Sequence, residues 1–120
     1  MEQAATKAKV DRSTDSAGRP VTVLRFTGDI SSTSKDAVVG TYQGLAKDSN
    51  PHILLDFTKV EYLNSSGIAL IIQLLMEAAK SDQKVHAFGL TPHFEKVFKM
   101  VGITKYATLH PDESTAKAAF

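Results

Sequence analysis

One stretch constrains the fold of this chain more than any other: an apolar run, a serine-rich junction and a long apolar segment follow one another between His52 and Ala79. The run His52–Phe57 is short and rich in residues that favour β-strands. From Ile68 onward, apolar residues recur with helical spacing and leave little of the expected helix free for solvent. The sequence therefore predicts a buried strand that leads through Asn64–Gly67 into a central helix.

Strands and helices alternate along the rest of the chain. We expect strands over residues 8–13, 21–27, 52–57, 85–90 and 106–109, and helices over 35–48, 66–80, 92–101 and 112–120. The order β-β-α-β-α-β-α-β-α is typical of a layered α/β domain. The 120 residues suffice for one domain, and we expect residues 1–7 to be flexible.

Composition argues against several classes of protein. The formal net charge is +1, and no block of lysine or arginine suggests direct binding to nucleic acid. The sequence contains no cysteine, which excludes disulfides and thiol chemistry. Neither a signal-peptide core nor a run long enough to span a bilayer is present. We expect a cytoplasmic protein that touches no membrane directly.

The usual catalytic signatures are missing. The glycines form neither a dinucleotide-binding nor a phosphate-binding loop, and the serines form no nucleophile elbow. The spacing of His52, His86, His93 and His110 does not match a metal site, so we interpret them as loop or strand-end residues. The sequence does not bring Asp56 and Glu61 together as an acid–base pair. We therefore expect a protein that is not an enzyme and needs no cofactor.

The serine-rich junction has two interpretations. Asn64 or Ser65 can cap the long helix, because either side chain can accept from its unpaired N–H groups. The same helix end suits a phosphate, so Ser65 is either a plain cap or a site of regulatory phosphorylation. A phosphate would add about −1.5 to −2 charges, enough to disrupt a docked partner. A nucleophilic Ser65 would need a positioned base and an oxyanion hole, for which the sequence offers no signature.

Three segments resemble the STAS-domain family, and in particular the bacterial anti-sigma factor antagonists. Asp56–Leu70 resembles the family's signature segment. Phe26–Ile30 is similar to its strand followed by Gly-Asp/Glu-Ile/Leu, and Pro92–Ile103 to its third helix. The resemblance implies a single STAS domain over residues 1–120, an α/β fold with a mixed sheet of four to five strands and about four helices mainly on one side.

The resemblance also implies a partner-switching function in transcription regulation. The unphosphorylated protein would bind an anti-sigma factor that is a GHKL-type serine kinase, and so free a sigma factor. Phosphorylation at Ser65 would release it, and a PP2C-type phosphatase would reset it. The docking surface would be the loops 29–33 and 60–67, with contacts from Asp29, Ser31, Tyr62, Leu63, Asn64, Ser66 and Gly67.

One position departs from the family pattern. Asn64 stands where many kinase-regulated members have aspartate, so the cap is kept while a negative charge beside Ser65 is lost. The alternative function is therefore a constitutive STAS subunit of an ABC-type lipid-transport complex, which would need no phosphorylation.

Overall fold

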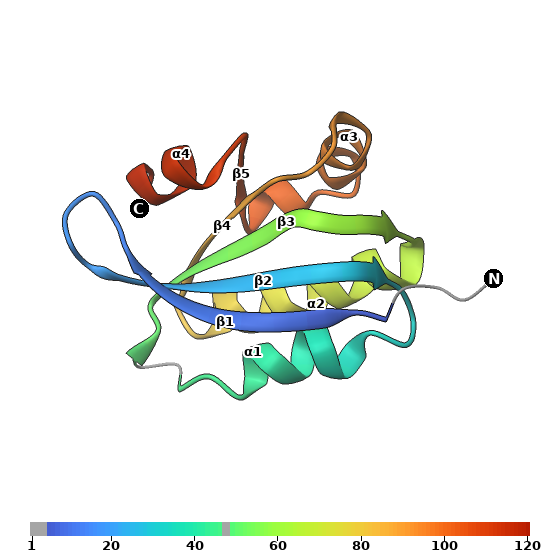
Figure 1. The fold of residues 1–120 in the computed structure, drawn as a ribbon, viewed down its shortest axis with the longest axis horizontal. Helices are drawn as coiled ribbons and strands as arrows, with labels where there is room; N and C mark the ends of the chain where they lie inside the picture. Colours follow the sequence, from blue (N-terminus) through green and yellow to red (C-terminus); the bar gives the residue numbers. More distant parts are fainter. Residues whose placement is uncertain (1–4, 47–48) are drawn as a thin grey trace.

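The computed structural model describes residues 5–46 and 49–120, and within them five strands form one sheet in the order β1-β2-β3-β4-β5 (Figure 1). The first pair is antiparallel and each later pair is parallel. The strands are β1 (Lys7–Thr14), β2 (Pro20–Ile30), β3 (His52–Leu63), β4 (Lys84–Phe88) and β5 (Thr108–His110). The predicted element order and the mixed sheet are confirmed.

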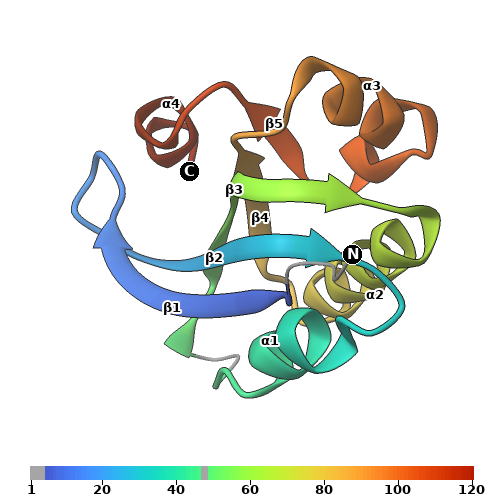
Figure 2. The same cartoon turned by 45° about the vertical axis from the view of Figure 1, so that its right-hand side comes forward.

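Helices cover both faces of the sheet unequally. They are a π-helical turn η1 (Asp36–Gly40) continuing into α1 (Thr41–Gln43), then α2 (Ser65–Lys80), α3 (Pro92–Met100), a 3₁₀ turn η3 (Ile103–Lys105) and α4 (Glu113–Ala118). Figure 2 shows α1 and α2 on one side of the sheet and α4 on the other. The prediction of helices mainly on one side is confirmed, with α4 as the exception.

The alternation of side chains along the strands explains this division. Leu24 and Leu55 face the main core, which α1, α2 and α3 close. Val23 and Leu54, one residue earlier, face a smaller cluster that Ala116 of α4 closes. The central segment of β3, residues 53–57, is buried throughout, as expected of a parallel strand covered on both sides.

Strands β2 and β3 are longer than predicted. The sequence suggested that they end at Thr27 and Phe57, but they continue to Ile30 and Leu63. The pairing of β2 with β3 shifts register twice in this extension, between Arg25 and Thr27 and between Gly28 and Asp29. Irregular pairing breaks the strict period of two, so the polar extension resembled a loop in the sequence.

The helix expected over 35–48 is also different. Residues 47–48 lie outside the described residues, and the helical segment ends at Gln43. Gly40 and Gly44 weaken helix propensity on either side of the only α-helical turn, and Gly44 is its C-cap. The end of the predicted helix is therefore wrong by at least three residues.

The N-terminal segment is partly described. Residues 1–4 of the predicted flexible segment 1–7 lie outside the described residues. Thr6 uses its hydroxyl to bond the Asp29 carbonyl and the Ser34 hydroxyl, and Lys7 begins β1. Residues 6 and 7 therefore belong to the folded domain.

Candidate functional site

The parallel pairing of β2 with β3 brings the two predicted docking loops together. Asp29 is the register partner of Tyr62, and Ile30 that of Leu63. The backbone N–H of Asn64 donates to the Ile30 carbonyl at 3.3 Å. Because both strands end at the same edge, the loop after β2 lies beside the start of α2.

Asn64, not Ser65, caps the central helix. The Asn64 side-chain oxygen accepts from the Gly67 N–H at 2.8 Å, while the Asn64 backbone is extended. Ser65 is therefore the first residue of α2, and its side chain is exposed. In the first turn of an α-helix the N–H groups have no intrahelical acceptor, and the dipole of a 16-residue helix favours negative charge there. The Ser65 side chain is thus accessible at a helix end whose dipole favours negative charge.

The predicted contact residues around Ser65 differ in exposure. Tyr62 is 48% exposed and Ser66 is exposed, while Asp29 and Asn64 are half-buried. Among the described residues, no hydrogen bond or ion pair occupies the Asp29 carboxylate. These four residues stay predicted partner contacts.

Three other predicted contacts need correction, because they are buried. Ser31 is only 6% exposed, and its backbone N–H donates to the Ser34 hydroxyl at 2.8 Å. Leu63 belongs to the main core. A Cβ on Gly67 would lie 2.2 Å from the Ile30 carbonyl oxygen. These residues shape the surface from beneath and do not offer side chains to a partner.

An apolar stripe extends from Ser65 along the outer side of α2. Ala69, Ile72 and Met76 follow Ser65 at i+4, i+7 and i+11, which places all four on one side of the helix. Met76 is 44% exposed. Ala69, Ile72 and Met76 line a shallow groove of about 380 Å³. Gln73, Glu77 and Lys80 also line this groove, so a partner that reaches Ser65 along α2 would meet an apolar stripe bordered by polar side chains.

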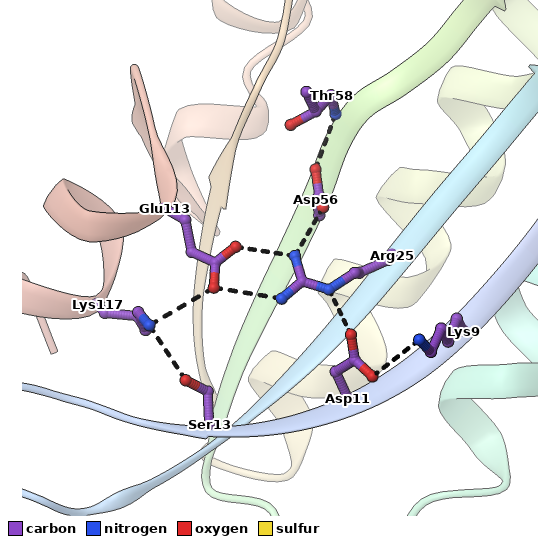
Figure 3. Close-up of polar contacts among 8 residues, drawn as sticks. All are labelled: Lys9, Asp11, Ser13, Arg25, Asp56, Thr58, Glu113 and Lys117. Carbon is purple, nitrogen blue, oxygen red and sulfur yellow. Dashed lines mark hydrogen bonds and ion pairs between the residues drawn. The ribbon is translucent and has the colours of Figure 1, made fainter.

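A second polar cluster lies on the opposite face of the sheet (Figure 3). The Arg25 guanidinium bonds three carboxylates from three different elements. Its Nε donates to Asp11 Oδ2 at 2.5 Å, and its Nη1 donates to Asp56 Oδ2 and to Glu113 Oε1, both at 2.8 Å. A second bond, from Nη2 to Glu113 Oε2 at 3.2 Å, makes the contact with α4 bidentate. Arg25 therefore fastens α4 to β1, β2 and β3.

The ion pairs in this cluster shift the pKa values of Arg25, Glu113 and Asp11. The hydrogen bond from Arg25 is the largest cause that lowers the pKa of Glu113 and of Asp11 below their usual values. Bonding to Glu113, Asp11 and Asp56 raises the pKa of Arg25, against the effect of burial. These shifts favour the charged forms of Arg25, Glu113 and Asp11, so the cluster is an ion-pair network.

Three of the four histidines lie in neighbouring strands, which the sequence did not indicate. His52, His86 and His110 belong to β3, β4 and β5. The His86 Nδ1 and His110 Nε2 atoms are 2.8 Å apart, and Phe120 packs against both His86 and His52. Burial, followed by His110, His52 and Lys84, lowers the pKa of His86 to about 4. The interpretation as loop or strand-end residues is confirmed for His52 and His110, which lie at the ends of β3 and β5. It is wrong for His86, which lies within β4, and for His93, which lies in α3.

No simple sequence signal would have found either cluster. Arg25 is a charged residue at an inward position of an apolar strand, which hints at a buried partner. Its three partners come from residues 14, 31 and 88 positions away, so they depend on strand order. Strand order cannot be derived from the periodicity of one sequence.

Within residues 5–46 and 49–120, no helix combines the length and apolar character that crossing a bilayer requires. Over the same ranges, no group of three or more His, Cys, Asp or Glu side chains is arranged to hold a metal ion.

This chain is similar to one family model and to several solved structures. A family model described as "Mlab, STAS domain" matches residues 13–111. An anti-sigma factor antagonist from Mycobacterium paratuberculosis shares 20% identity and a TM-score of 0.76, over 93% of this chain and 91% of its own. The Bacillus cell fate determinant SpoIIAA, in its phosphorylated form, shares 16% identity and a TM-score of 0.66, over 90% and 95%. The murine anion transporter Slc26a9 matches with 13% identity and a TM-score of 0.69, over 94% of this chain but 21% of the transporter.

Proposed function

This chain belongs to the STAS-domain family, and on that premise we propose that it is an anti-sigma factor antagonist controlled by phosphorylation at Ser65. In the unphosphorylated form it binds an anti-sigma factor of the GHKL serine-kinase type in the cytoplasm. That binding frees a sigma factor and so regulates transcription. The protein is a substrate of the kinase and of a PP2C-type phosphatase, and it is not itself an enzyme.

The exposure of Ser65 is the observation that carries this proposal. Asn64 performs the capping, and within residues 5–46 and 49–120 no hydrogen bond engages the Ser65 hydroxyl, so phosphorylation would break no contact there. The hydroxyl is accessible at the positive end of α2, where an added phosphate is compatible with folding. The modification would therefore change the surface without unfolding the domain.

The surface around Ser65 supports docking of a protein partner. Tyr62, which is 48% exposed, comes just before the junction. The stripe formed by Ala69, Ile72 and Met76 extends from Ser65 along α2. Aromatic and methionine side chains are common at the centre of protein interfaces. A phosphate on Ser65 would place about two negative charges at the head of this apolar surface, where they oppose an apolar or acidic partner.

The test compares adjacent serines in the same helical turn. We expect the cognate kinase to phosphorylate wild-type protein and Ser66→Ala but not Ser65→Ala, as measured by intact mass. Ser65→Ala should still bind the kinase, and Ser65→Asp should bind it more weakly because of the added charge. Phosphate incorporation into Ser65→Ala at the wild-type level, or equal affinity of the two Ser65 variants, would contradict the proposal.

One observation favours a second candidate, a constitutive STAS subunit of an ABC-type lipid-transport complex. The cap at position 64 is a neutral asparagine, so the acceptor serine lacks a neighbouring carboxylate within its own turn. In that role the protein would bind the ATPase subunit through the same end of α2 without phosphorylation. Membrane co-purification from native cells that persists in Ser65→Ala, together with an unmodified native mass, would favour this candidate.

A further inference from the structure

We propose that a cleft on the α4 side of the sheet binds a small organic phosphate. The cleft has a volume of about 740 Å³, within the usual range of small-molecule sites. Its wall combines strand residues of β1, β2 and β3 with Phe88 of β4 and Glu113 of α4. It lies on the face of the sheet opposite α2, and its lining includes neither Ser65 nor the apolar stripe.

The ion-pair network at one end of the cleft neutralises itself. Arg25, Lys9 and Lys117 supply three positive charges, and Asp11, Asp56 and Glu113 supply three negative charges. Every member contacts a member of opposite charge at 3.6 Å or less. The charged side chains at this end of the cleft therefore already have partners of opposite charge, so this end attracts a free ion only weakly.

A row of three residues beside the network, two of them exposed lysines, has no side-chain partner among the described residues. Lys7 of β1 is the register partner of Thr27 of β2, which is in turn the partner of Lys59 of β3. All three residues line the cleft and also an adjoining hollow of about 430 Å³, so they form the boundary between the two. Among the described residues, no hydrogen bond or ion pair engages either ammonium group or the Thr27 hydroxyl.

The arrangement of Lys7, Thr27 and Lys59 favours a negatively charged ligand. Neighbouring strands are about 4.8 Å apart, so the two long lysine side chains can both reach one group held above Thr27. Two uncompensated positive charges and a hydroxyl donor match a phosphate monoester, which carries about −1.5 to −2 charges at pH 7 and has three acceptor oxygens. Glu61, beside the adjoining hollow, would repel an anion at that end. The organic part of the ligand would therefore extend toward Phe88 and α4.

The phosphate could come from a soluble metabolite or from a lipid headgroup, and two arms of one experiment distinguish them. In the first arm, adenosine monophosphate is titrated into the ¹⁵N-labelled full chain and followed by NMR, with adenosine as the uncharged comparison. In the second arm, the protein is sedimented with phosphatidylcholine vesicles containing phosphatidic acid. Lys7→Gln/Lys59→Gln is the test variant, and Lys96→Gln/Lys105→Gln is a control with the same loss of charge at exposed sites on α3 and η3.

The expected result is saturable binding in one arm. If that arm is the titration followed by NMR, the amides of Lys7, Thr27 and Lys59 should shift. The test variant should bind roughly tenfold or more weakly, while the control variant binds as the wild type does. Adenosine should not bind. Equal weakening of both variants would show attraction by net charge alone and would overturn the proposal, as would absence of binding in both arms. Neither result would bear on phosphorylation at Ser65.

Discussion

Gly67 shows at the scale of one residue how the loop after β2 and the start of α2 are held together. An added Cβ would lie 2.2 Å from the Ile30 carbonyl oxygen and 2.7 Å from the Ile30 carbonyl carbon, both of them backbone atoms. Neither atom can move without shifting the end of β2. The glycine therefore permits the close approach that places Asp29 beside the head of the helix.

We expect Gly67→Ala to destabilise the domain by about 2 kcal/mol or more, because backbone must shift to relieve the clash. The matched control is Gly40→Ala in the first helical segment, where a Cβ would meet nothing closer than 3.9 Å. That change should stabilise by about 0.5–1 kcal/mol through the unfolded state. Urea unfolding of both variants measures the difference, and similar midpoints would contradict the close-approach argument.

His86 gives the stability a specific dependence on pH. Its pKa falls from 6.5 to about 4 on folding, because burial and the neighbouring His110, His52 and Lys84 disfavour its charged form. The unfolded chain therefore takes up a proton at this residue before the folded chain does. Stability is unaffected above about pH 6.5 and is lost as pH falls toward 4, by up to roughly 3 kcal/mol.

Substitution of His86 tests this directly. We expect His86→Gln to flatten the decline of unfolding free energy between pH 6.5 and 4, measured by urea unfolding at several pH values. His93→Gln, at an exposed position of α3, should keep the wild-type slope. A wild-type slope in both variants would show that another group controls acid stability.

At the scale of the element, the attachment of α4, a helix of six residues, to the sheet depends on a salt bridge as well as on apolar contacts. Few apolar groups attach it to the sheet, chiefly Ala116 and the adjacent Phe120. Glu113 adds a bidentate contact with Arg25, and the two side chains are only 31% and 29% exposed. A bidentate, partly buried pair in a network is the kind of ion pair that contributes measurably.

We expect Glu113→Gln to cost about 1–2 kcal/mol and to raise hydrogen exchange in residues 113–118 before exchange rises in α2. Glu95→Gln is the matched control, because it removes an i,i+4 ion pair of 2.9 Å with Lys99 whose side chains are 42% and 59% exposed. Its cost should be below about 0.5 kcal/mol. Equal costs would mean that Arg25 does not fasten α4.

The elements themselves were predictable where local signals agree. The Thr91 cap and Pro92 at the first helical position fixed the start of α3, and Gly102, with φ of 84°, follows its end. The extension of β3 was not predictable, because Thr58 and Lys59 are polar and the pairing there is irregular. Likewise, the choice between Asn64 and Ser65 as cap depends on backbone geometry that either residue could have adopted.

At the scale of the whole molecule, the sheet separates two surfaces of different character. Helices α2 and α4 lie on opposite sides of the sheet (Figure 2). The α2 surface carries Ser65 and an apolar stripe. The opposite surface carries the Arg25 network (Figure 3) and the row Lys7, Thr27 and Lys59. Of the first surface, the sequence predicted only the part around Ser65, because those residues are contiguous in one strand–helix junction. It did not predict the apolar stripe farther along α2. It did not predict the second, which β1, β2, β3 and α4 assemble from residues up to 106 positions apart.

If the partner docks along α2, then a charge on the apolar stripe should act like the phosphate, though at a distance from it. We expect Met76→Glu to weaken binding of the unphosphorylated protein to its kinase by at least roughly tenfold, since Met76 lies three helical turns from Ser65 on the same side. Met100→Glu, at a 78% exposed position at the end of α3, adds the same charge elsewhere and should leave affinity unchanged. Calorimetric titration measures both, with thermal melts to verify folding. Equal loss in the two variants would indicate a general charge effect, and no loss in Met76→Glu would confine the interface to the residues immediately around Ser65.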